Sequence, residues 1–153
     1  MPTLWDPATR AALVRRVAAL SPDATPRWGG FTAPQMLAHL TDALRMAMGE
    51  LPVARRPVPW LLYTPPFKQL IIHILPFPRG APTAPELLAR PLGVDPVDLE
   101  RERGAFAGAL DRFVARPMNG PWPVHPAFGP LSGATWGVLQ ARHADHHLRQ
   151  FGV

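Results

Sequence analysis

The chain has 153 residues, no cysteine and a formal net charge of +5, and these properties limit what it can be. Its length predicts a single domain over residues 1–153, with a hydrophobic core of its own. The lack of cysteine excludes disulfides, thiolate metal sites and cysteine nucleophiles, so any metal must be held by nitrogen and oxygen ligands. The first residues lack the basic and apolar run of a signal peptide, so we expect a cytoplasmic protein.

The positive charge is carried mostly by arginines that are spread along the chain. There is no basic run interleaved with aromatic residues, the pattern that favours nucleic acid. We therefore interpret the arginines as a solvated surface and expect no nucleic-acid partner.

Two helices are predicted in the first third of the chain. The first lies between Asp6, which can cap it ahead of a proline, and Ser21. The second lies between Thr32, a further capping residue, and Gly49. His39 stands at the border of the apolar face of this second helix, where it can point into the interior.

Residues 52–94 form a proline-rich insertion, with ten of the chain's prolines. The apolar stretch 60–78 raises the question of a membrane, but its two central prolines and Lys68 argue against a spanning helix. We expect a short helix near 66–75 inside an ordered excursion and no stable membrane association. A packed flap is the interpretation we favour, and a lid, a substrate pocket or a dimer contact is the alternative.

Two more helices follow the insertion. One begins at Asp95, with a proline after the cap, and stops before Pro117; the other begins at Ser132 and continues to about Gln150. No strand pattern of any length is present. Four helices with an insertion between the second and the third predict an all-α four-helix bundle.

Three of the six histidines lie within one and a half turns of the last helix. His143 and His147 are one turn apart on a stripe that begins with Trp136 and ends with Gln150. Polar groups on an inner stripe need partners, and a metal ion is one such partner. The spacing leaves His146 open as a ligand in place of His147.

A third ligand has to come from another part of the chain. His39 is our choice, His125 is the alternative and His73 the weaker one. Three neutral imidazoles with an open position suit zinc, nickel or another divalent ion. Histidines four residues apart also occur on solvated faces, so the spacing alone leaves a metal-free cluster open.

Motifs in both halves of the chain resemble the DUF1569 group of the DinB-like superfamily. They are HPAFGPLS at 125–132, WG at 136–137, HADHHLRQFG at 143–152, PFPRG at 76–80 and, for the superfamily, MLAHL at 36–40. Many relatives have Arg-Gly between the last ligand and the glutamine, where this chain has Leu148 and Arg149. The C-terminal motif is the more specific, and the motif at 36–40 is weak alone.

This resemblance implies a DinB-like, up-down-down-up four-helix bundle, often dimeric. It also implies a divalent metal held by His39, His143 and His147, with His146 as a flanking residue. Characterised members of the superfamily include thiol-dependent S-transferases and a thiol-dependent isomerase, which use a low-molecular-weight thiol.

Two hypotheses of function therefore stand side by side. The first is a metal-dependent thiol S-transferase or hydrolase that acts on a small-molecule substrate, with Gln150 or His125 in support. The second is a non-catalytic bundle that binds a metal, a small molecule or a protein partner. A membrane-surface protein that uses residues 60–78 is a third and minor alternative.

Overall fold

The computed structural model describes residues 1–55, 57–80, 83–88 and 96–153. In this part of the chain every regular element is helical, and the strand-like contact is a single bridge between His125 and Gly129. The prediction of an all-helical protein is therefore confirmed. The elements are the helices α1 (Pro7–Ala18), α2 (Ala33–Met48), α3 (Phe67–His73), α4 (Pro96–Ala115) and α5 (Gly133–Gln150), with the short 3-10 helices η1 (Trp60–Tyr63) and η2 (Pro85–Leu87).

The longer helices begin where the sequence predicts a cap. The Asp6 carboxylate accepts hydrogen bonds from the first backbone N–H groups of α1, and Ser132 accepts one at the start of α5. Thr32 and Gln35 form a reciprocal capping box on α2, which ends at Gly49 in the left-handed conformation, with φ 80°. The predicted cap of α4, Asp95, lies outside the described residues.

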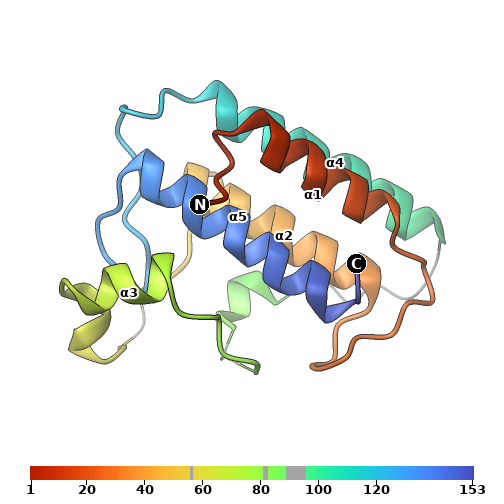
Figure 1. Ribbon diagram of the computed structural model, residues 1–153, viewed down its shortest axis with the longest axis horizontal. Coiled ribbons are helices and arrows are strands. Elements are labelled where there is room, and N and C mark those ends of the chain that lie inside the picture. Colours follow the sequence, from red (N-terminus) through yellow and green to blue (C-terminus); the bar gives the residue numbers. More distant parts are fainter. Residues whose placement is uncertain (56, 81–82, 89–95) are drawn as a thin grey trace.

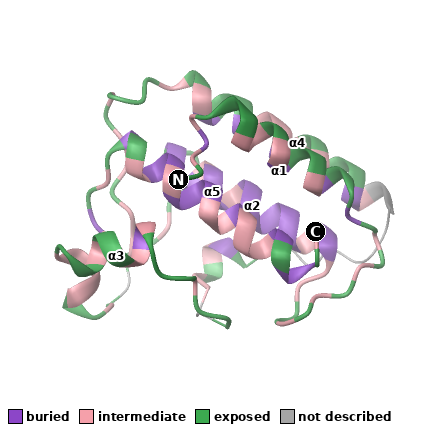
Figure 2. Cartoon of the chain, viewed as in Figure 1, coloured by how far each residue is buried: buried purple, intermediate pink, exposed green. Residues whose placement is uncertain are grey.

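Four helices enclose the hydrophobic core. Each of α1 and α2 contacts both α4 and α5, and the most extensive contact joins α2 to α4 (Figure 1). Figure 2 shows buried residues along α2 and α5, whereas the outer faces of α1 and α4 are exposed. Helix α2 is therefore the central element, and a polar side chain in its middle is enclosed on several sides.

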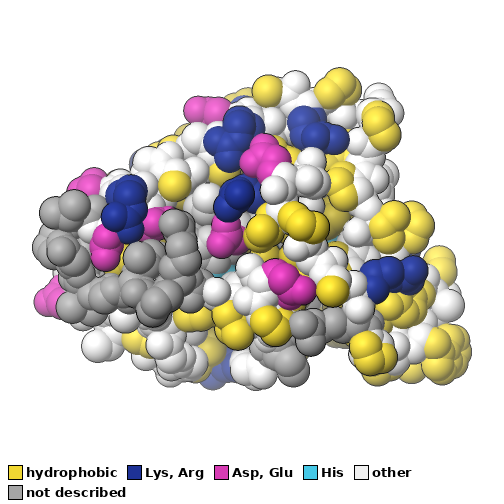
Figure 3. All heavy atoms as spheres, turned by 180° about the vertical axis from the view of Figure 1, so that it is seen from behind, with side chains coloured by type: hydrophobic (Ala, Val, Ile, Leu, Met, Phe, Trp, Pro, Cys, Tyr) yellow, Lys and Arg dark blue, Asp and Glu magenta, His cyan; other side chains and the backbone are white. Residues whose placement is uncertain are grey.

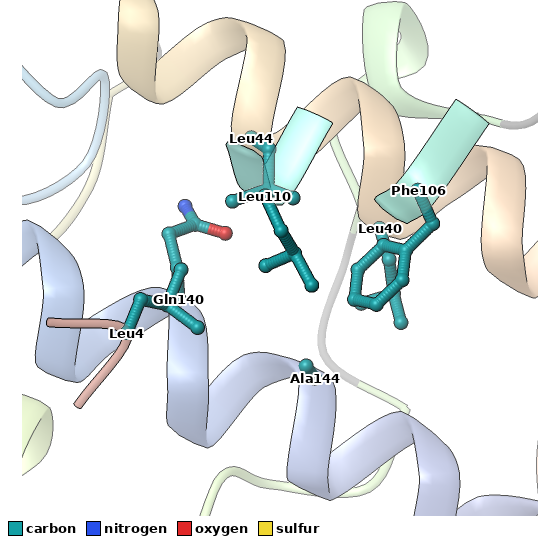
Figure 4. A pocket seen from close by; sticks show the side chains of 7 residues that line it. All are labelled: Leu4, Leu40, Leu44, Phe106, Leu110, Gln140 and Ala144. Atoms are coloured by element: carbon teal, nitrogen blue, oxygen red, sulfur yellow. The ribbon is translucent and has the colours of Figure 1, made fainter. Parts of the chain in front are cut away.

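The middle of the core is tightly packed and separate from the histidines. The side chains that meet there are Leu4, Leu40, Leu44, Phe106, Leu110, Gln140 and Ala144 (Figure 4). The gap between them admits no water molecule. Gln140 is the one polar member of this group, and its amide donates to the carbonyl of Ala43 at 3.3 Å.

The insertion is attached to the helices at several points. Helix α3 packs on α5, and η2 packs on α2. Lys68 donates to the carbonyls of Phe128 and Pro130, and Arg142 of α5 donates to carbonyls at the C-terminal end of α3. Helix α3 falls within the predicted 66–75 and ends before Ile74, whose backbone leaves the helical region.

The surface of the insertion is partly apolar. Trp60 and Ile74 are 69% and 68% exposed. On the face drawn in Figure 3, basic side chains lie singly among acidic and apolar ones. Within the described residues, no helix has the length and apolar character needed to cross a membrane.

The N-terminal segment holds the first half of α5. Leu4 donates its backbone N–H to the carbonyl of Gly137 at 3.0 Å, and the Trp5 indole donates to the carbonyl of Gly133 at 2.9 Å. A Cβ atom at Gly137 would lie 2.5 Å from the Trp5 ring, closer than real contacts allow. The absence of a side chain at Gly137 therefore permits this approach.

We predict that Gly137→Ala destabilises the protein although alanine favours helices. The displaced Trp5 should cost about 1–3 kcal/mol of unfolding free energy, the usual range for overpacking. Gly104→Ala on α4 is the matched control, because a Cβ there meets no atom within 4 Å. That control should gain up to about 1 kcal/mol. Urea unfolding measures both, and equal stabilisation by the two substitutions would contradict the proposed role of Gly137.

Candidate metal centre

His39 lies in the buried middle of α2. It is 3% exposed, and its ring packs against Phe31 with a centroid distance of 5.3 Å. Its Nδ1 atom is 2.8 Å from the carbonyl oxygen of Leu87, at the end of η2. A carbonyl can only accept, so Nδ1 carries the proton and the Nε2 atom of neutral His39 carries a free lone pair.

His143 and His147 face His39 from α5. The Nε2 atom of His143 is 3.1 Å from the Nε2 atom of His39 and 3.1 Å from that of His147. The ligand atoms of all three residues lie within 4.8 Å of one another. His39 is buried, whereas His143 and His147 keep part of their surface exposed.

Gln150 fixes the orientation of His147. Its side-chain oxygen is 2.8 Å from the Nδ1 atom of His147, while its amide nitrogen donates to the carbonyl of Trp28. Because the amide is used as a donor, the oxygen accepts and His147 Nδ1 carries the proton. The Nε2 atom of neutral His147 is therefore also unprotonated and turned towards the group.

This arrangement meets the chemical requirements of a divalent metal. Two unprotonated nitrogens share the single proton that His143 Nε2 can supply, so one acceptor lacks a donor. Nitrogens of a tetrahedral zinc site lie about 3.3 Å apart, given Zn–N bonds of about 2.0–2.1 Å. Two of the separations, at 3.1 Å, are close to this value, and all three ligand atoms lie within 4.8 Å of one another, so the group is compact enough to hold one metal ion.

The surroundings keep the three imidazoles neutral. Burial lowers the pKa of His39, against the opposing effects of Leu87 and Asp42. Burial and then repulsion from neighbouring histidines hold the pKa of His143 well below its ordinary value. The same causes lower the pKa of His147 to about 4 although Gln150 opposes them. Neutral imidazole is the form that binds metals.

His146 lies beside the group and does not belong to it. Its ring contacts Trp28 and Phe77, with centroid distances of 5.6 and 6.0 Å. Burial lowers its pKa, as do the charges of Arg79 and Arg149, whereas Asp145 raises it. The spacing left both His146 and His147 open as ligands; in the structure it is His147 that lies with His39 and His143.

The other two candidate ligands lie elsewhere. His125 Nδ1 accepts hydrogen bonds from the backbone N–H groups of Ala127 and Phe128, at 3.0 and 3.1 Å, and so forms a turn. His73, at the end of α3, contacts the sulfur of Met1. The described residues that could jointly hold a metal are His39, His143 and His147.

Sequence reasoning missed three parts of the site. The carbonyl of Leu87 is a backbone group, and no residue type signals it. The loop that receives Gln150 did carry a signal, the adjacent glycines at 29 and 30. In the structure Gly29 has φ +76°, and a Cβ there would lie 2.6 Å from the amide nitrogen of Gln150. Phe31 and Phe77, which pack beside the histidines, also went unrecognised.

We predict that His125 makes unfolding pH-dependent. Burial lowers the pKa of folded His125 to about 4, below its ordinary value. Between about pH 6.5 and 4 the unfolded chain binds this proton and the folded chain does not, so stability falls as the pH falls. Below both values the loss is complete, and above about pH 6.5 the contribution is fully present.

His125→Asn keeps an acceptor for the turn and removes the proton. Urea unfolding of metal-free protein at pH 7 and pH 5 should show a weaker pH dependence in the variant. The difference should be at most about 1.4 kcal/mol per pH unit. Equal slopes for the variant and the unaltered protein would mean that His125 does not titrate in this range.

Comparison with known proteins identifies a family for the chain. The sequence model of a family described as "Protein of unknown function (DUF1569)" matches residues 7–152. No curated protein and no solved structure matches the chain significantly. The matched residues run from α1 to the end of α5 and include the three converging histidines, and the chain therefore belongs to the DUF1569 family.

Proposed function

We propose that this protein is a metal-dependent enzyme, a thiol S-transferase or a hydrolase, whose divalent ion is held by His39, His143 and His147. The observation that carries the proposal is the convergence of the side chains of three histidines. In His39 and His147 the Nδ1 atom carries the proton and donates a hydrogen bond, so the Nε2 atom is unprotonated. A histidine that holds its outer N–H in this way is typical of metal ligands.

Zinc and nickel are the metals that we propose for this donor set. All three donors are imidazole nitrogens, which suit zinc, nickel, copper and iron and give little affinity for magnesium or calcium. Three protein ligands and a solvent-exposed side are typical of catalytic sites, whereas structural zinc sites have four protein ligands. The partial exposure of His143 and His147 provides that open side.

A divalent ion in this position supplies one kind of chemistry: it lowers the pKa of a thiol or a water that takes the open position. The remaining functions belong to the chain. Leu87 and Gln150 hold two imidazoles in the binding tautomer. Phe31 and Phe77 pack against the histidines and shield them from bulk water, which strengthens electrostatic interactions there.

The resemblance to the DinB-like superfamily supports the thiol as co-substrate and a small-molecule substrate. We propose the up-down-down-up bundle of that superfamily as the topology, and a homodimer as the assembly. Support for the bundle comes from the contacts of α1 and α2 with both α4 and α5. The chain itself contains no cysteine, so a thiol has to be external.

Turnover separates the enzyme from a non-catalytic module. An enzyme should consume an electrophile in the presence of a small thiol, and a chelator should stop the reaction. Metal binding with no turnover across thiols and hydrolysable esters would favour the module instead.

Metal content should depend on the two histidines that lie one turn apart. Protein without a histidine tag should take up about one equivalent of zinc, and His143→Ala and His147→Ala should each lose it while keeping the helical circular dichroism spectrum. His146→Ala is the matched control on the same helix and should keep its metal. Full loading of His143→Ala, or an equal loss in His146→Ala, would show that the ligand set is wrong.

Gln150 should affect metal affinity without being a ligand. Gln150→Leu removes the acceptor that fixes His147, and loss of such a partner typically costs about 10–100-fold in affinity. Gln140→Leu is the matched control, because Gln140 is also buried on α5 but binds Ala43 instead of a histidine. Competition with a chromogenic chelator measures both. Equal affinities of the two variants would show that Gln150 does not support the site.

A further inference from the structure

A cationic side chain lies at the rim of the histidine group. The guanidinium carbon of Arg79 is 4.4 Å from the centroid of the Trp28 ring. Arg79 is exposed, and it makes no ion pair with any residue in the described part of the chain. Its position is therefore set by an aromatic ring and leaves its charge unneutralised.

Trp28 links this charge to the histidines. Its ring packs on His146, the residue before His147, and its carbonyl accepts the amide of Gln150. On the same side Phe77, two residues before Arg79, contacts both His143 and His146. The contact with Trp28 and the chain link to Phe77 thus place Arg79 near the partly exposed histidines of α5.

The guanidinium is prepared to bind an anion. The contact with Trp28 is one between a charge and a ring, and no hydrogen bond to another described residue takes any of the five N–H donors of Arg79. The one acidic residue of α5, Asp145, is already paired with Arg16 at 2.8 Å and with Arg149 at 3.0 Å. No acidic side chain of the described residues competes for Arg79, so the rim keeps a positive charge.

We propose that Arg79 is the carboxylate-binding residue of the metal centre, and that the natural ligand is an acid with a metal-binding donor atom at one end and a carboxylate at the other. This inference rests on the metal site proposed above. A planar carboxylate fits a single guanidinium fork through two parallel hydrogen bonds. Arg79 and Trp28 bind the acid end, and the three histidines define where the other end lies.

The test compares two thiols of equal length, mercaptohexanoate and mercaptohexanol, on protein loaded with cobalt. A thiolate is a strong metal ligand, and its binding to cobalt produces a charge-transfer absorption band that can be titrated. The unaltered protein should bind the acid about fivefold more tightly than the alcohol, as expected for a partly exposed charge-assisted pair. Added salt should reduce this preference.

Arg79→Gln should abolish the preference and leave the affinity for the alcohol unchanged. Arg55→Gln is the matched control, because Arg55 is also exposed in the insertion and lies over an aromatic ring, that of Tyr63. It should keep the fivefold preference.

The outcomes distinguish the two proposals. Equal affinity for both thiols in a cobalt-loaded protein, or a preference that survives in Arg79→Gln, would overturn the carboxylate subsite and leave the metal centre standing. Failure to take up cobalt would overturn the metal centre and the subsite with it.

Discussion

Three imidazole nitrogens that need a common partner are the constraint on which the rest of this site depends. His39 and His147 each use one ring nitrogen as a donor, to Leu87 and to Gln150, so their inner nitrogens present lone pairs. Lone pairs at 3.1 Å from a third nitrogen repel unless a proton or a cation lies between them. Burial makes protonation costly, as the lowered pKa of His143 shows. A cation bound by the three neutral imidazoles would remove the repulsion between the lone pairs without requiring any histidine to be protonated.

The scaffold separates packing from chemistry along α5. The first half of this helix is held by Trp5 and Trp136, with Gly137 allowing the N-terminal segment to approach closely. The second half carries the histidines and remains partly open to solvent. Because both halves belong to one rigid element, the tight packing at one end limits the movement of the ligands at the other. Sites on helices keep their geometry better than sites on loops, and a metal site tolerates deviations of only a few tenths of an ångström.

The sequence predicted the helices well because their caps are local: Asp6, Thr32 and Ser132 each bond to backbone within three residues. The spacing of His143 and His147 is likewise a property of one helix. The prediction of His39 as a ligand rests on its place at the border of the apolar face of α2 and on the resemblance, since no local pattern connects it to α5. The contact of the Leu87 carbonyl with His39 could not be predicted from the sequence, because it depends on how the insertion folds back onto α2. The positions of Phe77 and Arg79 could not be predicted for the same reason. The composition of 52–94 predicted an ordered excursion but did not indicate which of its side chains would lie near the histidines.

The insertion and the helices therefore contribute different things to one site. The helices supply the three nitrogens, and their positions are fixed by the core. The insertion supplies the Leu87 carbonyl, the Phe77 ring and the Arg79 charge. The Leu87 carbonyl holds His39 in the tautomer that can bind a metal, so the position of its segment affects metal binding. Phe77 packs on the ring of the ligand His143, whereas Arg79 lies over Trp28. Changes at Arg79 should therefore alter what can approach without disturbing what is bound. A site divided in this way can keep its metal chemistry while its substrate range is set by the segment that is least constrained by the core.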